Sequence, residues 1–176
     1  MTSYVVLLRG VNVGGRAKVS MAALRETCAS VGCEEVATYI QSGNVVLRSA
    51  LGADALRDRL ASAIVDQLGV RPAVMVRTAS EMADVIRHNP FTDADTAILH
   101  VGFLGGPPSA DAAGRAMAIA TPPEELAIRG AEVYLHLPNG LGRSKLAAAV
   151  INPRLLDVPV TVRNWRTVSK LVEMSS

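Results

Sequence analysis

Aromatic residues, cysteines and long hydrophobic runs are all scarce in this sequence, and each scarcity excludes a class of protein. Only 3% of the 176 residues are aromatic, and the two cysteines are Cys28 and Cys33. Two cysteines cannot hold a small disulfide scaffold, so we expect a reducing, cytoplasmic location. The longest apolar runs, such as Leu146–Ile151, are far shorter than a membrane-spanning helix. We therefore expect no membrane association.

The excess of basic over acidic side chains is also small. Eighteen Lys and Arg stand against sixteen Asp and Glu, which leaves a net charge of +2. Such a balance argues against a surface that binds polyanions throughout, but it permits a local basic patch. The length and the 49% hydrophobic content allow one medium domain or two small domains that each have a core.

The first 77 residues predict the order strand, helix, strand, strand, helix, strand. The apolar run Tyr4–Leu8 and the alternation over Val36–Gln41 are typical of strands. Ser20 predicts a helix start and Gly32 its end. The other expected elements are a strand at Val45–Arg48, a helix from about Asp54 that Gly69 ends, a strand at Ala73–Arg77 and a short helix around Met82–Ile86.

The second half repeats this order. The expected elements are a strand at Ala97–Leu104, a helix at Asp111–Ala120, hairpin strands at Leu126–Arg129 and Glu132–Leu137, a helix at Ser144–Ile151, a strand at Val160–Arg163 and a closing helix. The sequence of Val74–Thr78 also resembles that of Val160–Asn164, and each segment forms the fourth expected strand of its half.

We therefore predict an α+β fold of two tandem ferredoxin-like (βαββαβ) plaits, each followed by a helix. The predicted domains are 1–90 and 96–176, with 91–95 as the junction. A single mixed sheet of eight strands is the alternative. Tyr4–Leu8 is apolar on both faces, so the other repeat or a trailing helix must cover the face that the unit's own helices leave open.

One loop of the first plait has the composition of an anion-binding site. In a plait, the loop after the first strand and the hairpin between the second and third strands lie at one end, which places Arg9–Lys18 beside Gln41–Asn44. The loop has three glycines, three cations and no carboxylate, and it leads into a helix N-terminus. Glycines let backbone N–H groups converge on an anion, so we predict a phosphate or carboxylate site. Its candidate ligand-binding residues are Arg9, Asn12, Gly14, Gly15, Arg16, Lys18, Ser42 and Asn44. The alternative is a glycine-rich turn with solvated cations.

A second basic cluster lies near the end of the sequence. From Gly140 onward there are six cations against two carboxylates, a local net charge of +4. Two loops of this region open into expected helices, with Ser144 and Asn164 as plausible N-caps. Trp165 lies within the cluster, where it would stack on a base or anchor the last helix. The candidate ligand-binding residues here are Arg143, Ser144, Lys145, Arg163, Asn164 and Trp165. We expect the two clusters to face a shared cleft.

Several of these segments resemble a catalogued bacterial family of unknown function, DUF1697. The segments that carry the resemblance are Leu7–Gly15, Tyr39–Val46, Asn89–Phe91, Tyr134–His136, Gly142–Leu146 and Arg163–Val168. The resemblance spans the chain in the same order. It implies a cytoplasmic bacterial protein built from two ferredoxin-like halves, and it implies no particular reaction or catalytic residues.

Other residues give weaker indications. His100 and His136 are expected together on the helix-free face of the second sheet, where they would bind a metal, act as a base or line a packed interface. No further ligands accompany them, so we predict no metal and no cofactor. Cys28 is expected to be inert core. Asp93 and Asp95 lack a calcium-loop pattern and indicate a solvated junction.

Three functional hypotheses remain. The first is a protein that binds a phosphate-bearing ligand, either a small molecule such as a nucleotide or a nucleic acid. The second is an enzyme for a small phosphorylated or acyl-phosphate substrate, by analogy with acylphosphatases, in which Arg9 or Arg16 would act with Asn12 or Asn44. The third is a structural or interaction module, whose exposed edge strands would also allow a homodimer.

Overall fold

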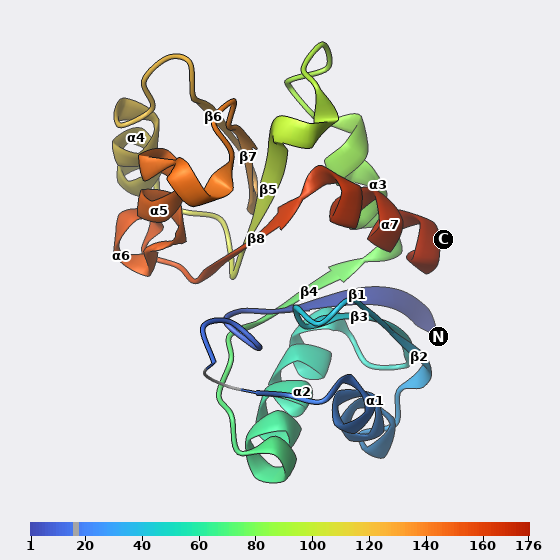
Figure 1. Ribbon diagram of the computed structural model, residues 1–176. Helices are drawn as coiled ribbons and strands as arrows, with labels where there is room; N and C mark the ends of the chain where they lie inside the picture. Colours follow the sequence, from blue (N-terminus) through green and yellow to red (C-terminus); the bar gives the residue numbers. More distant parts are fainter. Residues whose placement is uncertain (16–17) are drawn as a thin grey trace. The chain divides into compact units, whose positions relative to one another are not determined.

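The computed structural model describes residues 1–15 and 18–176 and divides into two compact units. The first unit comprises Met1–Ala83 and Leu171–Ser176, and the second comprises Asp84–Lys170. Each unit contains one four-stranded antiparallel sheet, so the chain has an α+β fold and not one mixed sheet of eight strands (Figure 1). The predicted domain boundaries, 1–90 and 96–176, remain predictions.

The first sheet has the strand order β2-β3-β1-β4. The elements in chain order are β1 (Thr2–Leu8), α1 (Met21–Ser30), β2 (Glu34–Tyr39), β3 (Asn44–Ser49), α2 (Ala53–Leu68), β4 (Val74–Thr78) and α3 (Ala79–Arg87). Ser20 caps α1 by accepting a hydrogen bond from Ala23 N, and Gly69 ends α2 with a φ of 67°. Local cap chemistry therefore sets helix boundaries where the sequence predicts them.

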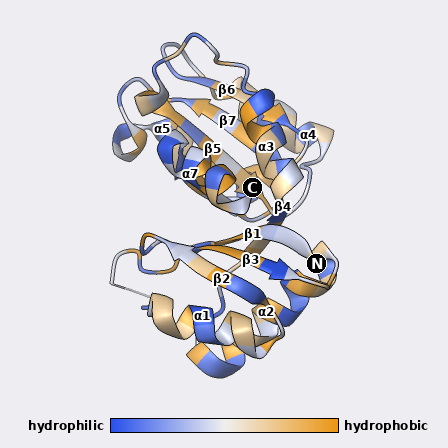
Figure 2. Ribbon diagram, turned by 90° about the vertical axis from the view of Figure 1, so that its right-hand side faces the viewer, coloured by the Kyte–Doolittle hydropathy of each residue, from blue (hydrophilic) through white to orange (hydrophobic). Residues whose placement is uncertain are grey.

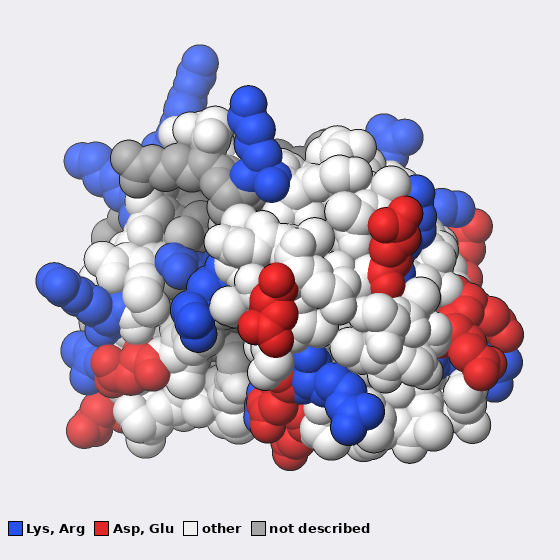
Figure 3. Space-filling view, turned by 90° about the horizontal axis from the view of Figure 1, so that it is seen from below, with Lys and Arg blue, Asp and Glu red and all other residues white. Residues whose placement is uncertain are grey.

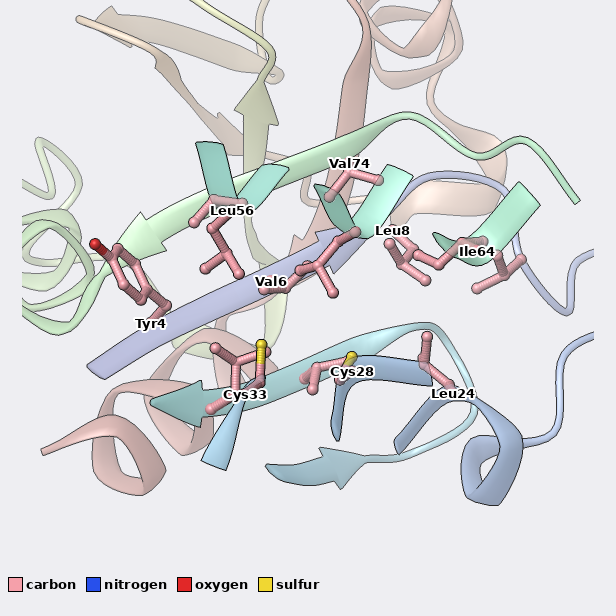
Figure 4. Close-up of a cluster of buried hydrophobic side chains, with 14 of the residues drawn as sticks. Tyr4, Val6, Leu8, Leu24, Cys28, Cys33, Leu56, Ile64 and Val74 are labelled. Carbon is pink, nitrogen blue, oxygen red and sulfur yellow. The ribbon is translucent and has the colours of Figure 1, made fainter. Parts of the chain in front are cut away.

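The core of the first unit lies between one face of this sheet and helices α1 and α2. Alternate residues of β1, namely Tyr4, Val6 and Leu8, are buried there against Leu24 and Leu60. Figure 4 shows these side chains of β1 with Cys28, Cys33 and residues of both helices around them. Neither cysteine forms a disulfide and both are buried, which confirms Cys28 as a core residue.

The intervening residues of β1 are buried as well. Val5 and Leu7 are fully buried on the opposite face of the sheet. The end of α7 (Trp165–Ser175) belongs to this unit, and the Ser3 hydroxyl donates a hydrogen bond to the Ser175 carbonyl over 2.8 Å. A trailing helix thus contributes to this face, as the two-sided apolar pattern of β1 predicts.

The second sheet has the corresponding order β6-β7-β5-β8. The elements are β5 (Leu99–Leu104), α4 (Ala110–Ala118), β6 (Glu125–Arg129), β7 (Glu132–His136), α5 (Lys145–Ile151), α6 (Pro153–Leu156) and β8 (Val160–Asn164), with short 3-10 helices η1 (Thr96–Ile98) and η2 (Leu141–Arg143). Helices α4, α5 and α6 lie on one side of the sheet (Figure 1) and bury residues such as Leu104, Leu135 and Val150 against it. Hydrophobic residues run along the strands of this sheet (Figure 2).

The register of the second sheet corrects one expectation. His100 lies opposite Leu135, whereas His136 lies opposite Leu99. Residues directly opposite each other in an antiparallel pair share a face, and consecutive residues alternate between faces. His100 therefore shares the helix-covered face with Leu135, and His136 lies on the other face. The prediction that both histidines share the helix-free face is wrong because the register differs by one residue from the one it requires.

Two element boundaries also differ from the sequence prediction. Strand β2 ends at Tyr39, because Ile40 adopts a φ of 50° that is rare for a β-branched residue. Ala97 and Ile98 form part of η1 and not of a strand. No helix among the described residues is both long and apolar enough to cross a membrane.

Candidate functional site

The loop between β1 and α1 carries three exposed glycines in the left-handed conformation. Gly10, Gly14 and Gly15 have φ values of 75°, 61° and 73°. A Cβ at any of the three would meet no atom within 4 Å, so backbone conformation and not crowding is what requires glycine here. The space beside their Cα atoms is therefore open. Gly14 and Gly15 are residues that the sequence predicts to bind a ligand.

Asn12 holds this loop in place. Its Nδ2 donates to Val19 O over 2.9 Å and to Gln41 O over 2.8 Å, and its Oδ1 accepts from Val19 N over 2.8 Å. One side chain thus closes the loop and joins it to the β2–β3 hairpin. Both amide hydrogens of Asn12 are used within the protein, so this residue positions the loop.

The hairpin packs tightly against the same loop. Gly43 has a φ of 74°, and a Cβ there would lie 2.5 Å from Val11 Cγ2 and 2.8 Å from Leu8 Cβ. Leu8 N also donates to Gly43 O over 2.9 Å. The predicted juxtaposition of the loop Arg9–Lys18 with Gln41–Asn44 is therefore confirmed for Val11 and Asn12, while Arg16 and Ala17 lie outside the described residues.

Ser42 and Asn44 form hydrogen bonds within the hairpin. Asn44 is completely buried, and its Nδ2 donates to Tyr39 O over 3.1 Å and to Ser42 Oγ over 2.9 Å. These contacts shape the turn that supports the loop. Their predicted ligand-binding role stays a prediction.

The cations of the loop flank the glycines in sequence. Arg9 is half-buried and Lys18 is exposed, while Arg16 lies outside the described residues. Arg9 N donates to Ala73 O over 3.0 Å, which fixes the backbone where β1 ends. The first turn of α1 has no acidic residue. A positive partial charge at the helix start, two cations in the same loop and glycines with open space beside them together suit an anion.

In the second cluster, two of the predicted residues cap helices. Ser144 is buried, and its Oγ accepts from Ala147 N over 2.8 Å at the start of α5. Asn164 Oδ1 accepts from Thr167 N over 2.8 Å at the start of α7. The two side chains satisfy backbone N–H groups that a ligand would otherwise occupy. Helix α5 has only seven residues, so its N-terminus adds little favourable charge.

Arg163 is a buried cation. It is 8% exposed, and its Nη1 donates to Thr161 Oγ1 over 2.7 Å and to Val162 O over 3.0 Å. Burial lowers the pKa of its guanidinium to about 10. Arg77, at the matching position of the first unit, likewise donates to the carbonyl of Val76 over 3.0 Å. The repeated contact indicates that both arginines hold the ends of their strands.

The other residues of the second cluster reach the surface. Arg143 and Lys145 are exposed, and Trp165 is half-buried at the start of α7. Figure 3 shows basic and acidic side chains interspersed on the face that it presents, with basic ones gathering toward its left edge. Among the described residues on this face, acidic side chains interrupt the basic ones, so these residues form no continuous basic surface of the kind that long nucleic-acid contacts require. Ser144, Arg163 and Asn164 of the second cluster bond within the protein, so the β1–α1 loop, with its open glycine positions, has the geometry better suited to a ligand.

The remaining candidates from the sequence are less exposed. Burial lowers the pKa of His100, and the Ile98 backbone partly offsets this effect. Burial raises the pKa of the Cys28 thiol to about 12, and Cys33 contributes in the same direction. Among residues 1–15 and 18–176, no group of three or more His, Cys, Asp or Glu side chains is placed to hold a metal ion.

Sequence reasoning missed the groups that anchor the loop. These are the carbonyl oxygens of Val19 and Gln41 and the side chain of Val11, which contacts the hairpin glycine. Asn12 itself is among the predicted residues, and its type could have shown its positioning role, because asparagine tolerates the left-handed region and bonds the backbone locally.

Comparison with known proteins supports the fold and the family. No curated protein matches the chain. A solved structure described as the conserved bacterial protein SP0830 from Streptococcus pneumoniae is 23% identical, with a TM-score of 0.81 and 99% of each chain covered. At this identity the likeness establishes the fold alone. The family model described as protein of unknown function (DUF1697) matches residues 1–134. This match covers well over half of the chain, which therefore belongs to the DUF1697 family.

Proposed function

We propose that this protein binds a phosphate-bearing ligand, a nucleotide or a nucleic acid, at the β1–α1 loop of the first unit. The observation that carries the proposal is the row of open glycine positions, Gly10, Gly14 and Gly15, in a loop without carboxylates. Backbone N–H groups in such conformations can converge on an oxyanion. Arg9 and Lys18 would supply the positive charge.

The supports of the loop favour a preformed site. Asn12 and Gly43 tie the loop to the hairpin through hydrogen bonds and direct packing. A loop that is already ordered loses less conformational entropy when a ligand binds. Asn12, Ser42 and Asn44 would act by positioning the loop, while the glycine amides and the cations would contact the phosphate.

The second unit has a basic cluster of its own. Arg143 and Lys145 are exposed and could contact a phosphate, whereas Arg163, Ser144 and Asn164 hold backbone and helix ends. Trp165 would anchor α7. The enzymatic alternative has less support, because the amide hydrogens of Asn12 and Asn44 already donate within the protein. Neither side chain has an N–H left to orient a water molecule.

We also propose that each unit is a ferredoxin-like plait. The order β1-α1-β2-β3-α2-β4 and the antiparallel sheet order β2-β3-β1-β4 support this assignment, and the second unit repeats both. The family and the two unpaired cysteines support a bacterial, cytoplasmic protein. Strands β2 and β6, each at one edge of its sheet, would offer edges for a homodimer.

A thermal-shift panel tests the ligand proposal. Nucleotides, sugar phosphates, acetyl phosphate and short RNA and DNA are added to the full-length protein at low and high salt. A small phosphorylated ligand should raise the melting temperature selectively, by mass action on the native state. A shift that only oligonucleotides produce, and that salt removes, would assign the site to nucleic-acid backbone.

The matched variants are Lys18→Gln and Arg59→Gln. Both remove one exposed positive charge, but Arg59 lies on α2 and outside the loop. We expect the ligand-induced shift to fall in Lys18→Gln and to persist in Arg59→Gln. A flat panel with a cooperative melt, or equal loss in both variants, would contradict the proposal and favour an interaction module.

A further inference from the structure

A cavity of about 200 Å³ opens in the second unit, where the segment after α3 meets the ends of β6 and β7. Its lining combines polar and aromatic side chains, and the residues are Pro90, Phe91, Thr92, Asp93, Ala94, Glu125 and His136. None of these residues belongs to the β1–α1 loop. Two segments that carry the family resemblance, Asn89–Phe91 and Tyr134–His136, both contribute to it.

The cavity lining pairs an imidazole with a carboxylate. Glu125 and His136 lie directly opposite each other on the β6–β7 hairpin, with Glu125 Oε1 3.2 Å from His136 Nδ1. The distance permits an ion pair when the imidazole is protonated, but the two groups are not aligned for a hydrogen bond. Nδ1 is buried and has no hydrogen-bond partner among the described residues. The Glu125 side chain is 59% exposed, so its carboxylate is accessible to a ligand.

The aromatic residue of the lining, Phe91, is held in place by its own loop. The Phe91 ring lies 5.7 Å from the His136 ring, measured between centroids, at an angle of 31°. Asn89 Oδ1 accepts from Phe91 N over 3.0 Å, and Asn89 Nδ2 donates to Phe91 O over 3.4 Å. The ring is therefore positioned beside the imidazole in the absence of any ligand.

The charges of the lining residues favour a positively charged ligand. Asp93 and Glu125 are its acidic residues, and no Lys or Arg is among the lining residues. An organic cation would gain charge-assisted hydrogen bonds from the carboxylates and a cation–π contact from Phe91. A metal ion fits less well, because no group of three potential ligands is assembled in the described part of the chain.

We propose that this cavity binds a small organic cation with N–H donors, an alkylguanidinium or alkylammonium group. One N–H would donate to Glu125 Oε1, a second would reach Asp93, and the Phe91 ring would cover the charge. The volume suits a single head group, because pockets for drug-sized ligands begin at about 300 Å³.

The proposal is tested with methylguanidinium chloride as the probe. The full-length protein is titrated while the ring proton resonances of Phe91 and His136 are followed by NMR. We expect saturable shifts at both rings. Tetramethylammonium, which has the charge but no N–H, should bind more weakly, and acetate should produce no saturable shift.

Isosteric variants test the same point without emptying the cavity. Glu125→Gln and Asp93→Asn should each weaken methylguanidinium binding by about threefold or more, which is the size expected of a partly exposed charge pair. Glu124→Gln changes the neighbouring carboxylate outside the cavity lining and should leave binding unchanged. The proposal is wrong if methylguanidinium shows no saturable shift, if tetramethylammonium binds as tightly, or if all three variants behave alike.

Discussion

Removing the Asn12 side chain should destabilise the first unit by more than an ordinary loop substitution. The change Asn12→Ala deletes three hydrogen bonds, to Val19 O, Gln41 O and Val19 N. At about 0.5–1.5 kcal/mol each, and toward the lower end because the site is partly exposed, the loss is about 2 kcal/mol. Alanine must also adopt the φ of 56° that Asn12 has, which adds about 1 kcal/mol. We therefore expect a total loss of about 3 kcal/mol in the free energy of unfolding.

Two further variants separate these contributions in urea denaturation. Asn12→Gly deletes the same hydrogen bonds but accepts the backbone conformation, so it should be more stable than Asn12→Ala by about 1 kcal/mol. Asn139→Ala, in an exposed turn, should remain within about 0.5 kcal/mol of the natural protein. The reasoning fails if Asn12→Ala is as stable as Asn139→Ala, or if Asn12→Gly is the less stable of the pair.

Three other predictions follow from packing and burial. Gly43→Ala should lower the free energy of unfolding by about 2–4 kcal/mol, because the new Cβ would lie 2.5 Å from Val11 Cγ2. Gly14→Ala meets no neighbour and should lower it by about 1 kcal/mol through backbone strain alone. Equal melting temperatures of the two variants would contradict this. Burial raises the pKa of the Cys28 thiol to about 12, so at pH 8 it should react with a disulfide reagent only as fast as the protein unfolds. Because the unfolded thiol loses its proton near pH 9 and the folded one only near pH 12, the free energy of unfolding should fall as the pH rises from 9 toward 12. Fast labelling of the folded protein would refute this prediction. Tyr134→Phe removes a buried 2.9 Å hydrogen bond to Val85 O and should lower the free energy of unfolding, measured in urea, by about 1–2 kcal/mol. An unchanged free energy of unfolding would contradict this and would mean that the Val85 carbonyl accepts from another donor.

Much of the fold could be predicted because local chemistry decides it. Ser20 and Gly69 mark helix boundaries by capping, and the two-sided apolar run of β1 marks a central strand. The face of His100 could not be predicted, since a register offset of one residue reverses it. Helix α6, of four residues, is too short for a periodic pattern.

The candidate site was predictable in position but not in the role of each residue. The βαββαβ order places the glycine loop beside the β2–β3 hairpin, and the Asn12 hydrogen bond to Gln41 O confirms this. That Asn12 and Asn44 are used internally depends on backbone carbonyls whose positions only the folded chain sets. Likewise Asp93, expected in a solvated junction, lines a cavity with the distant His136. A cleft shared by the two basic clusters stays a prediction.

The backbone amides of the glycine loop provide the most direct test of the proposed phosphate site. In a 1H–15N NMR titration of the full-length protein with inorganic phosphate at constant ionic strength, the amide resonances of Gly10, Gly14 and Gly15 should move saturably. Gly106 and Gly130, which lie in the second unit, should not move. Uniform small changes across all five glycines, or the same changes with chloride, would contradict a phosphate site in this loop.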